Sequence, residues 1–199
     1  RAINLGGDFM FHALFSRGML YSNSNPEAAY LDLKEADKYP FPYRSEEMNA
    51  YTTAVTRVVN IAFMSNLDYN LLHKYFDDIL KDINTVIELN SIVREQCSAS
   101  ELKLREKDVS FMYYVRGHLY YSVNNYSKAI DAFESLIRLG QLQDLKDFFY
   151  PGGVYYLLGY CRLNNKGYNY FNKAIKDFKI GCEEYNNSQC CQAYYDLKY

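Results

Sequence analysis

A seven-residue motif occurs twice in this chain, and its repetition constrains the fold more than any other feature of the sequence. Residues 15–21 read FSRGMLY and residues 114–120 read YVRGHLY, with Arg-Gly, Leu and Tyr in the same order. A short polar break follows each motif, and after it comes an alanine-bearing segment, EAAYLDLKEADKYP or YSKAIDAFESLIRLG. Internal repetition of this kind predicts a stack of similar structural units instead of one irregular core.

Small residues at matching positions indicate what each unit is. Two antiparallel helices can approach closely only where one of them presents a small side chain. Gly18 and Gly117 would provide that contact on the first helix of each unit, and Ala29 and Ala129 on the second. Large residues three or four positions away are placed to fill the space around the contact, namely Tyr21, Tyr120, Leu33 and Phe133. Each unit is therefore predicted to be a helical hairpin.

The spacing of these residues resembles the signature of the tetratricopeptide repeat family. The matching positions in the later copy are Tyr113, Gly117, Tyr120, Ala129, Phe133 and Leu136, and Pro40 closes the first copy as the family's terminal proline does. Residues 157–182 carry three extra loop residues and resemble the related Sel1-like repeat, with matches at Leu158, Gly159, Gly167, Lys173, Ala174, Gly181 and Cys182. The resemblance implies an all-α fold, a right-handed superhelical stack of antiparallel helix pairs with about eight or nine helices.

The repeats are expected to form one domain over residues 1–199. Copies are predicted near residues 11–40, 46–90, 98–140 and 151–182, followed by a terminal helix over residues 188–199. The second copy departs from the pattern, because Asn60 stands where the repeat has its small glycine. Local signals agree with these bounds: Ser98-Ala99-Ser100-Glu101 is a capping-box sequence, Gly140 suits a left-handed helix cap, and Pro42 and Pro151 interrupt the chain between copies.

The composition narrows the range of partners. The 199 residues are 49% hydrophobic and carry a formal charge of -2 with a pI near 6.0, so the chain has no general attraction for nucleic acid. No stretch approaches the roughly 18 to 20 apolar residues that a membrane-spanning helix requires. We therefore expect no nucleic acid partner and no membrane span.

Catalytic and metal-binding patterns are missing from the sequence. The histidines His12, His73 and His118 are scattered, and none has a second histidine or a cysteine at a metal-ligand spacing. No phosphate-binding glycine loop, zinc-peptidase motif or nucleophile elbow is present. A structural zinc site needs four ligands, and the sequence has no CxxC pair. We expect no enzymatic activity, no metal and no cofactor.

Three of the five cysteines lie near the end of the sequence, at Cys182, Cys190 and Cys191. The seven residues between Cys182 and Cys190 would let the end of one helix face the start of the next, where a disulfide would join them. This spacing resembles the cysteine-rich Sel1-like proteins that some bacteria secrete, and an oxidised pair would favour a periplasmic or secreted location. The alternative is three reduced cysteines in a helix pair of a cytoplasmic protein.

The resemblance also implies where a partner binds. In tetratricopeptide repeats the first helices of the pairs line a concave surface, and a fixed set of their positions contacts the ligand. Carried onto this chain, these positions include Phe15, Met19, Tyr114, His118, Tyr121, Tyr156, Tyr160 and Asn164. Most are aromatic or apolar, so the expected ligand is an extended or helical segment with apolar residues. If the register is wrong by one residue, the same tyrosines belong to the core between helices.

Together these features predict a protein-interaction module: a scaffold, adaptor or co-chaperone that binds a peptide or partner protein in a concave groove. The alternative is a secreted or periplasmic, disulfide-bearing Sel1-like protein that recognises an extracellular or cell-wall ligand. The final segment, QCCQAYYDLKY, adds one expectation. If its helix is unpaired, its exposed aromatic residues would promote self-association.

Overall fold

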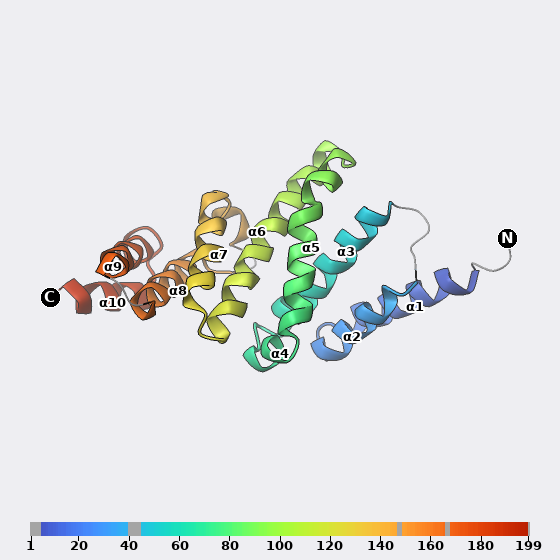
Figure 1. Cartoon of the computed structure of the whole chain (residues 1–199), viewed down its shortest axis with the longest axis horizontal. Coiled ribbons are helices and arrows are strands. Elements are labelled where there is room, and N and C mark those ends of the chain that lie inside the picture. Colours follow the sequence, from blue (N-terminus) through green and yellow to red (C-terminus); the bar gives the residue numbers. More distant parts are fainter. Residues whose placement is uncertain (1–4, 40–44, 147–148, 166–167, 199) are drawn as a thin grey trace. The chain divides into compact units, whose positions relative to one another are not determined.

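The structure of the chain is a computed structural model that describes residues 5–39, 45–146, 149–165 and 168–198. These residues form helices, turns and loops without a β-strand, so the prediction of an all-α fold is confirmed for them (Figure 1). The α-helices are α1 (Leu5–Tyr21), α2 (Pro26–Ala36), α3 (Glu46–Val58), α4 (Tyr69–Lys74), α5 (Phe76–Glu95), α6 (Ala99–Ser122), α7 (Tyr126–Arg138), α8 (Pro151–Asn164), α9 (Tyr168–Glu183) and α10 (Ser188–Lys198). The described part thus has ten α-helices, because the second predicted copy contains the additional short helix α4.

The chain divides into two compact units. Unit 1 comprises residues 1–112 and unit 2 comprises residues 113–199, so the boundary between them falls inside α6. In unit 1, α1 packs on α2 and α3 packs on α5; in unit 2, α8 packs on α7 and α9, and α10 packs on α9. The organisation of the whole chain as one repeat domain stays a prediction.

The core of unit 1 is formed by the apolar faces of its helices. On α2 the buried residues are Ala29, Tyr30, Leu33 and Ala36, whose spacing places them on one face of a helix. Gly18 of α1 meets this face, because a Cβ atom on Gly18 would lie 3.1 Å from the Ala29 carbonyl oxygen and 3.1 Å from the Leu33 side chain. The small-residue contact predicted for the first copy is confirmed.

The second hairpin is irregular where its glycine is missing. Helix α3 continues into a π-helix, Val59–Met64, that contains Asn60. The Asn60 side chain is buried at 2% exposure, and its amide nitrogen donates a hydrogen bond to the Thr56 carbonyl oxygen at 2.8 Å. A π-helix accommodates an extra residue in a helical turn. The departure that the sequence indicates at Asn60 therefore coincides with a change in helix type.

Unit 2 contains two close approaches between a glycine and an aromatic ring. A Cβ atom on Gly117 of α6 would lie 2.3 Å from the Phe133 ring of α7, and one on Gly159 of α8 would lie 2.6 Å from the Phe178 ring of α9. Phe133 is fully buried and Phe178 is 1% exposed, so neither ring has free space to move into. The glycine contact predicted at Gly117 is confirmed, and Gly159 provides the same kind of contact.

The predicted helix ends also match the structure. The carboxylate of Glu101 accepts hydrogen bonds from the backbone and the hydroxyl of Ser98, directly before α6. Gly140 follows α7 with a left-handed φ of 70°, and Pro151 is the first residue of α8. Three residues named in the sequence analysis, Pro40, Pro42 and Gly167, lie outside the described residues.

A buried arginine connects three helices of unit 1. The guanidinium of Arg57, on α3, donates two hydrogen bonds to Asp82 on α5, at 2.8 and 2.6 Å. It donates another to Asp37, directly after α2. The side chains of Arg57 and Asp82 are each only 9% exposed. Charge-assisted, bidentate hydrogen bonds of this kind fix both the distance and the rotation of the helices that carry them.

Unit 2 has an equivalent buried arginine. Arg162 on α8 donates hydrogen bonds to Asp177 on α9 and to Glu134 on α7. The side chains of Arg162 and Asp177 are 9% and 7% exposed. Each unit therefore holds consecutive helices together through one arginine shared by two carboxylates.

Candidate functional site

Four tyrosines of unit 2 form a cluster that we call the tyrosine cluster: Tyr121, Tyr126, Tyr156 and Tyr160. The ring centroids of Tyr121 and Tyr160 are 5.8 Å apart, and Tyr126 lies 6.5 Å from Tyr121 and 6.4 Å from Tyr160. These three rings meet edge to face, and Tyr156 adjoins Tyr160 at 6.5 Å. All four side chains are partly exposed. The cluster thus presents part of its aromatic side chains to solvent.

Three helices position the cluster. Tyr121 is near the end of α6, Tyr126 is the first residue of α7, and Tyr156 and Tyr160 are one turn apart on the same face of α8. The turn between α6 and α7 is tight because Asn124 adopts a left-handed φ of 57° and the Asn125 side chain caps α7. This turn brings Tyr126 against the other rings.

The structure brings together three of the sequence-predicted residues, Tyr121, Tyr156 and Tyr160, and adds Tyr126. Sequence reasoning missed Tyr126 because it considered only first helices of the pairs. The signal that could have found it is the capping residue Asn125, which places the next side chain at the start of α7, beside the end of α6. Asn164 lies one turn beyond Tyr160, is exposed, and donates a hydrogen bond from its amide to the Tyr160 carbonyl oxygen at 2.8 Å.

Two other predicted residues of unit 2 pack inward. His118 is 5% exposed and meets the Phe133 ring edge to face at 5.9 Å, while Tyr114 stacks on Phe149 at 4.0 Å. Burial lowers the pKa of His118 to about 3, so its imidazole is neutral near pH 7. The prediction that His118 lies on a ligand-facing surface is therefore wrong, because its side chain belongs to the core between helices.

The predicted residues of unit 1 do not form part of the tyrosine cluster. Phe15 stacks on Phe11 with ring centroids 5.7 Å apart and packs against a small core that includes Leu14 and Ala36. Met19 is 46% exposed on α1. Both residues belong to unit 1, and their role in partner binding stays a prediction.

An open groove adjoins the tyrosine cluster at Tyr156. It encloses about 400 Å³ and is lined on its other side by residues of α10, namely Ser188, Gln189, Gln192, Ala193 and Asp196. The Gln192 amide donates a hydrogen bond to the Asp196 carboxylate at 2.7 Å. Groups of this kind can hydrogen-bond the backbone of a bound peptide.

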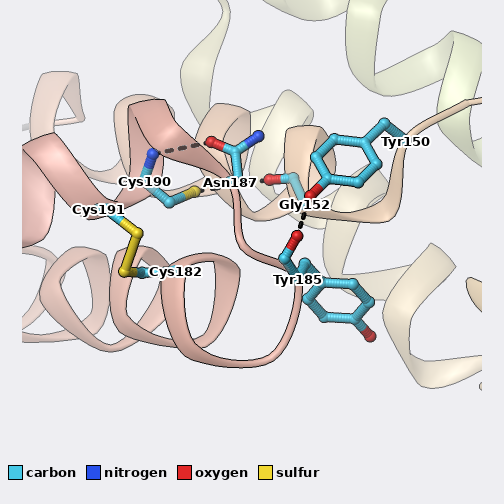
Figure 2. The surroundings of a disulfide bond; sticks show 7 residues. All are labelled: Tyr150, Gly152, Cys182, Tyr185, Asn187, Cys190 and Cys191. Carbon is cyan, nitrogen blue, oxygen red and sulfur yellow. Dashed lines mark hydrogen bonds between the residues drawn. A yellow bond between two sulfur atoms is a disulfide. The ribbon is translucent and has the colours of Figure 1, made fainter.

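The cysteines at the end of the described chain correct a prediction. The disulfide joins Cys182 to Cys191, and Cys190, the partner expected from the sequence, is a buried free thiol (Figure 2). The Cys190 side chain lies on the inner side of α10, with its sulfur 3.5 Å from the Gly152 carbonyl oxygen. Burial, with a smaller contribution from the charge of Asp177, raises the pKa of the Cys190 thiol to about 12. The thiol is therefore protonated and unreactive near neutral pH.

Helix α10 is held by more than the disulfide. The Asn187 side chain accepts a hydrogen bond from the Cys190 backbone at 2.8 Å, and the Tyr150 hydroxyl donates to the Tyr185 carbonyl oxygen (Figure 2). Tyr194 is 9% exposed and Tyr195 is 53% exposed, so α10 buries one of its aromatic residues and presents the other. The helix is paired with α9, and self-association through it stays a prediction.

Comparison with known proteins identifies no relative. The chain has no significant match among protein-family models, curated proteins or solved structures. Within the described ranges, no helix has the length and apolar character needed to cross a bilayer.

Proposed function

We propose that this chain is a protein-interaction module, a scaffold, adaptor or co-chaperone, that binds a peptide or partner protein with apolar residues at the tyrosine cluster. The observation that carries the proposal is a cluster of four partly exposed tyrosines from three helices, in which Tyr160 contacts each of the other three. Such rings offer a large, rigid contact area at low cost in conformational entropy, and tyrosine is enriched among the residues that dominate binding energy.

The proposal includes a repeat architecture: a right-handed superhelical stack of helix pairs related to tetratricopeptide and Sel1-like repeats. Two observations support it. The glycine-to-phenylalanine contacts recur at Gly117 and Gly159, and the buried arginines Arg57 and Arg162 each connect their own helix to an earlier and a later one. In such a stack the first helices share one face, and α6 and α8, which carry Tyr121 and Tyr160, would be first helices of their pairs.

Selection from a displayed library of random peptides tests this function. Wild-type protein should enrich peptides with an apolar motif, and a Tyr121→Ala, Tyr160→Ala double variant should bind the selected peptides about 30-fold more weakly or not at all. The matched control is Tyr195→Ala, because Tyr195 is an exposed tyrosine of the same unit outside the cluster. Circular dichroism verifies that each variant is folded.

The control decides how the result is interpreted. Loss of binding in the double variant but not in Tyr195→Ala supports the tyrosine cluster as the binding surface. Undiminished binding by a folded double variant contradicts it.

A second candidate function is favoured by the disulfide between Cys182 and Cys191. Disulfides persist in oxidising compartments, so a bridged protein would act outside the cytoplasm, as a secreted or periplasmic protein that recognises an extracellular or cell-wall ligand. Differential alkylation of the protein from its native cells tests this: protection of both cysteines supports the proposal, and alkylation of both argues against it.

A further inference from the structure

A cleft in unit 1 is separate from the tyrosine cluster. It encloses about 650 Å³ and is lined by side chains of α1, α2, α3 and α5. Its volume lies within the range of roughly 300 to 1,000 Å³ that small-molecule and side-chain pockets occupy. The cleft is much larger than a metal ion, so a ligand that fills it must carry several non-hydrogen atoms.

The floor of the cleft carries an excess of negative charge. Arg57 is the single cation between the carboxylates of Asp82 and Asp37. Asp37 binds Arg57 through one of its two oxygens, and its side chain is 37% exposed. At the mouth, Lys34 is paired with Asp78 at 2.5 Å and so does not compensate Asp37. Among the described residues, the second carboxylate oxygen of Asp37 has no hydrogen-bond donor, and a ligand cation could bind there.

Comparison with unit 2 shows what the cluster of unit 1 lacks. There, the Glu134 carboxylate disfavours the ionised form of Asp177 and the Lys173 ammonium favours it, so the chain supplies a cation besides Arg162. In unit 1 the strongest charges that act on Asp82, apart from Arg57, are the carboxylates of Asp37 and Asp78. Among the described residues of the lining, the carboxylates of Asp37, Glu46, Asp78 and Asp82 outnumber the cations Lys34, Arg57 and Lys81, four to three.

A buried tyrosine also borders this cleft. Tyr30 lines the cleft and is 0% exposed, and its phenol oxygen is buried without a hydrogen-bond partner among the described residues. A buried polar group left without a partner destabilises a protein, and a bound ligand can supply the partner. Tyr39 and Phe11 add aromatic surface to the lining. Aromatic rings pack against the aliphatic stem of an organic cation and attract its positive charge.

We infer that this cleft binds a basic side chain of a peptide, with the guanidinium or ammonium group at Asp37 and the aliphatic stem against Phe11 and Tyr39. The inference rests on the proposed peptide-binding function but uses a different surface. A guanidinium is the better fit, because its several donors can serve Asp37 and the Tyr30 oxygen at once. The tyrosine cluster would contact apolar residues, and this cleft would select a basic residue.

Calorimetric titration with acetyl-Gly-Arg-Gly-amide tests the inference. The matched probe is the same peptide with citrulline, which keeps the shape of arginine and removes its charge. Wild-type protein should bind the arginine peptide at least about tenfold more tightly than the citrulline peptide, since a charge-assisted hydrogen bond is lost. Asp37→Asn should weaken arginine-peptide binding by a similar factor, and Tyr30→Phe, which keeps the ring, by a few-fold.

Two control variants test whether arginine-peptide binding depends on this cleft and not on other charges or on the tyrosine cluster. Glu35→Gln changes a carboxylate of α2 that pairs with Lys38 and does not line the cleft, so its affinity should equal that of wild type. The Tyr121→Ala, Tyr160→Ala variant should also bind the arginine peptide normally, whichever result the display experiment gives. Circular dichroism establishes that each variant is folded.

Three outcomes would overturn the inference. The first is equal affinity for the arginine and citrulline peptides, and the second is unchanged affinity in both folded cleft variants. The third is binding of putrescine, a free diamine, as tightly as the peptide, which would show that the cleft recognises a free amine and not a peptide side chain.

Discussion

Helices approach one another closely in both units, but the residues at these contacts differ between the units. In unit 2 the paired helices meet where Gly117 and Gly159 lie against buried phenylalanine rings, and the helices are regular there. In the second hairpin of unit 1, buried Asn60 lies in the π-helix that follows α3, and Arg57 joins this hairpin to Asp37 and Asp82. A regular helix thus accompanies the glycine contacts of unit 2, and a π-helix accompanies a larger polar residue in unit 1.

Replacing the buried arginines should change the stability of the protein more than any other substitution proposed below. Arg57→Met and Arg162→Met should each lower the free energy of unfolding by about 3–5 kcal/mol, because each leaves buried carboxylates without their cation. The loss should be greater for Arg57→Met, since Lys173 remains near Asp177 in unit 2. Urea denaturation measures both.

Arg17→Met is the control for this pair of variants. Arg17 also binds a carboxylate, Asp32, but its side chain is 55% exposed, so solvent screens the interaction and the substitution should change stability little. Equal losses in all three variants would show that burial of the arginines does not set their contribution.

The next effect is a pH dependence that belongs to unit 2. Burial lowers the pKa of His118 to about 3, below its ordinary value of about 6.5. The unfolded chain therefore binds a proton that the folded chain does not, so this contribution to stability is complete above pH 6.5 and is lost as the pH falls. At pH 4.5 the loss from this group is about 3 kcal/mol.

Thermal melting as a function of pH, compared between wild type and His118→Leu, isolates this contribution. The raised pKa of Asp177, about 6 because of burial, works in the opposite direction: its contribution is lost as the pH rises through about 6. That contribution is common to both proteins. If the two pH profiles are parallel, His118 is not buried as described.

A smaller effect is expected at the end of unit 2. Cys191→Ser should destabilise α10 by about 2–3 kcal/mol, because the disulfide closes a short loop between residues 9 apart in sequence. Cys190→Ala should keep the bridge. Thiol titration of the unfolded proteins, with urea denaturation, distinguishes the two variants, and loss of the bridge in Cys190→Ala instead would restore the pairing predicted from the sequence.

The smallest effect compares two glycines of α8. Gly159→Ala should lower the free energy of unfolding by about 1–2 kcal/mol, because the added methyl group meets the Phe178 ring, although alanine favours the helix. Gly153→Ala should raise it by up to about 1 kcal/mol, because a Cβ atom there meets no atom within 4 Å. Changes of the same sign would contradict the close approach in unit 2.

Local and short-range signals were enough to predict much of the fold. The capping sequence at Ser98, the glycine at Gly140 and the proline at Pro151 each act within one helical turn, so their effect can be read without knowledge of distant residues. Part of the candidate site followed in the same way, since Tyr156 and Tyr160 are one turn apart on one helix. The place of Tyr126 could not be predicted in this way, because Tyr126 belongs to the next helix and joins the cluster through the turn between α6 and α7.

The helical hairpins, their ends and the small residues at which two helices approach could be predicted from residues close together in the chain. The carboxylates around Arg57, the inward position of His118 and the pairing of Cys182 with Cys191 instead of Cys190 became clear only from the packed helices. These features depend on how each helix is rotated about its own axis. One residue along a helix turns a side chain by about 100°, so a partner across the interface is chosen by how the packed helices are rotated, which many distant contacts fix together.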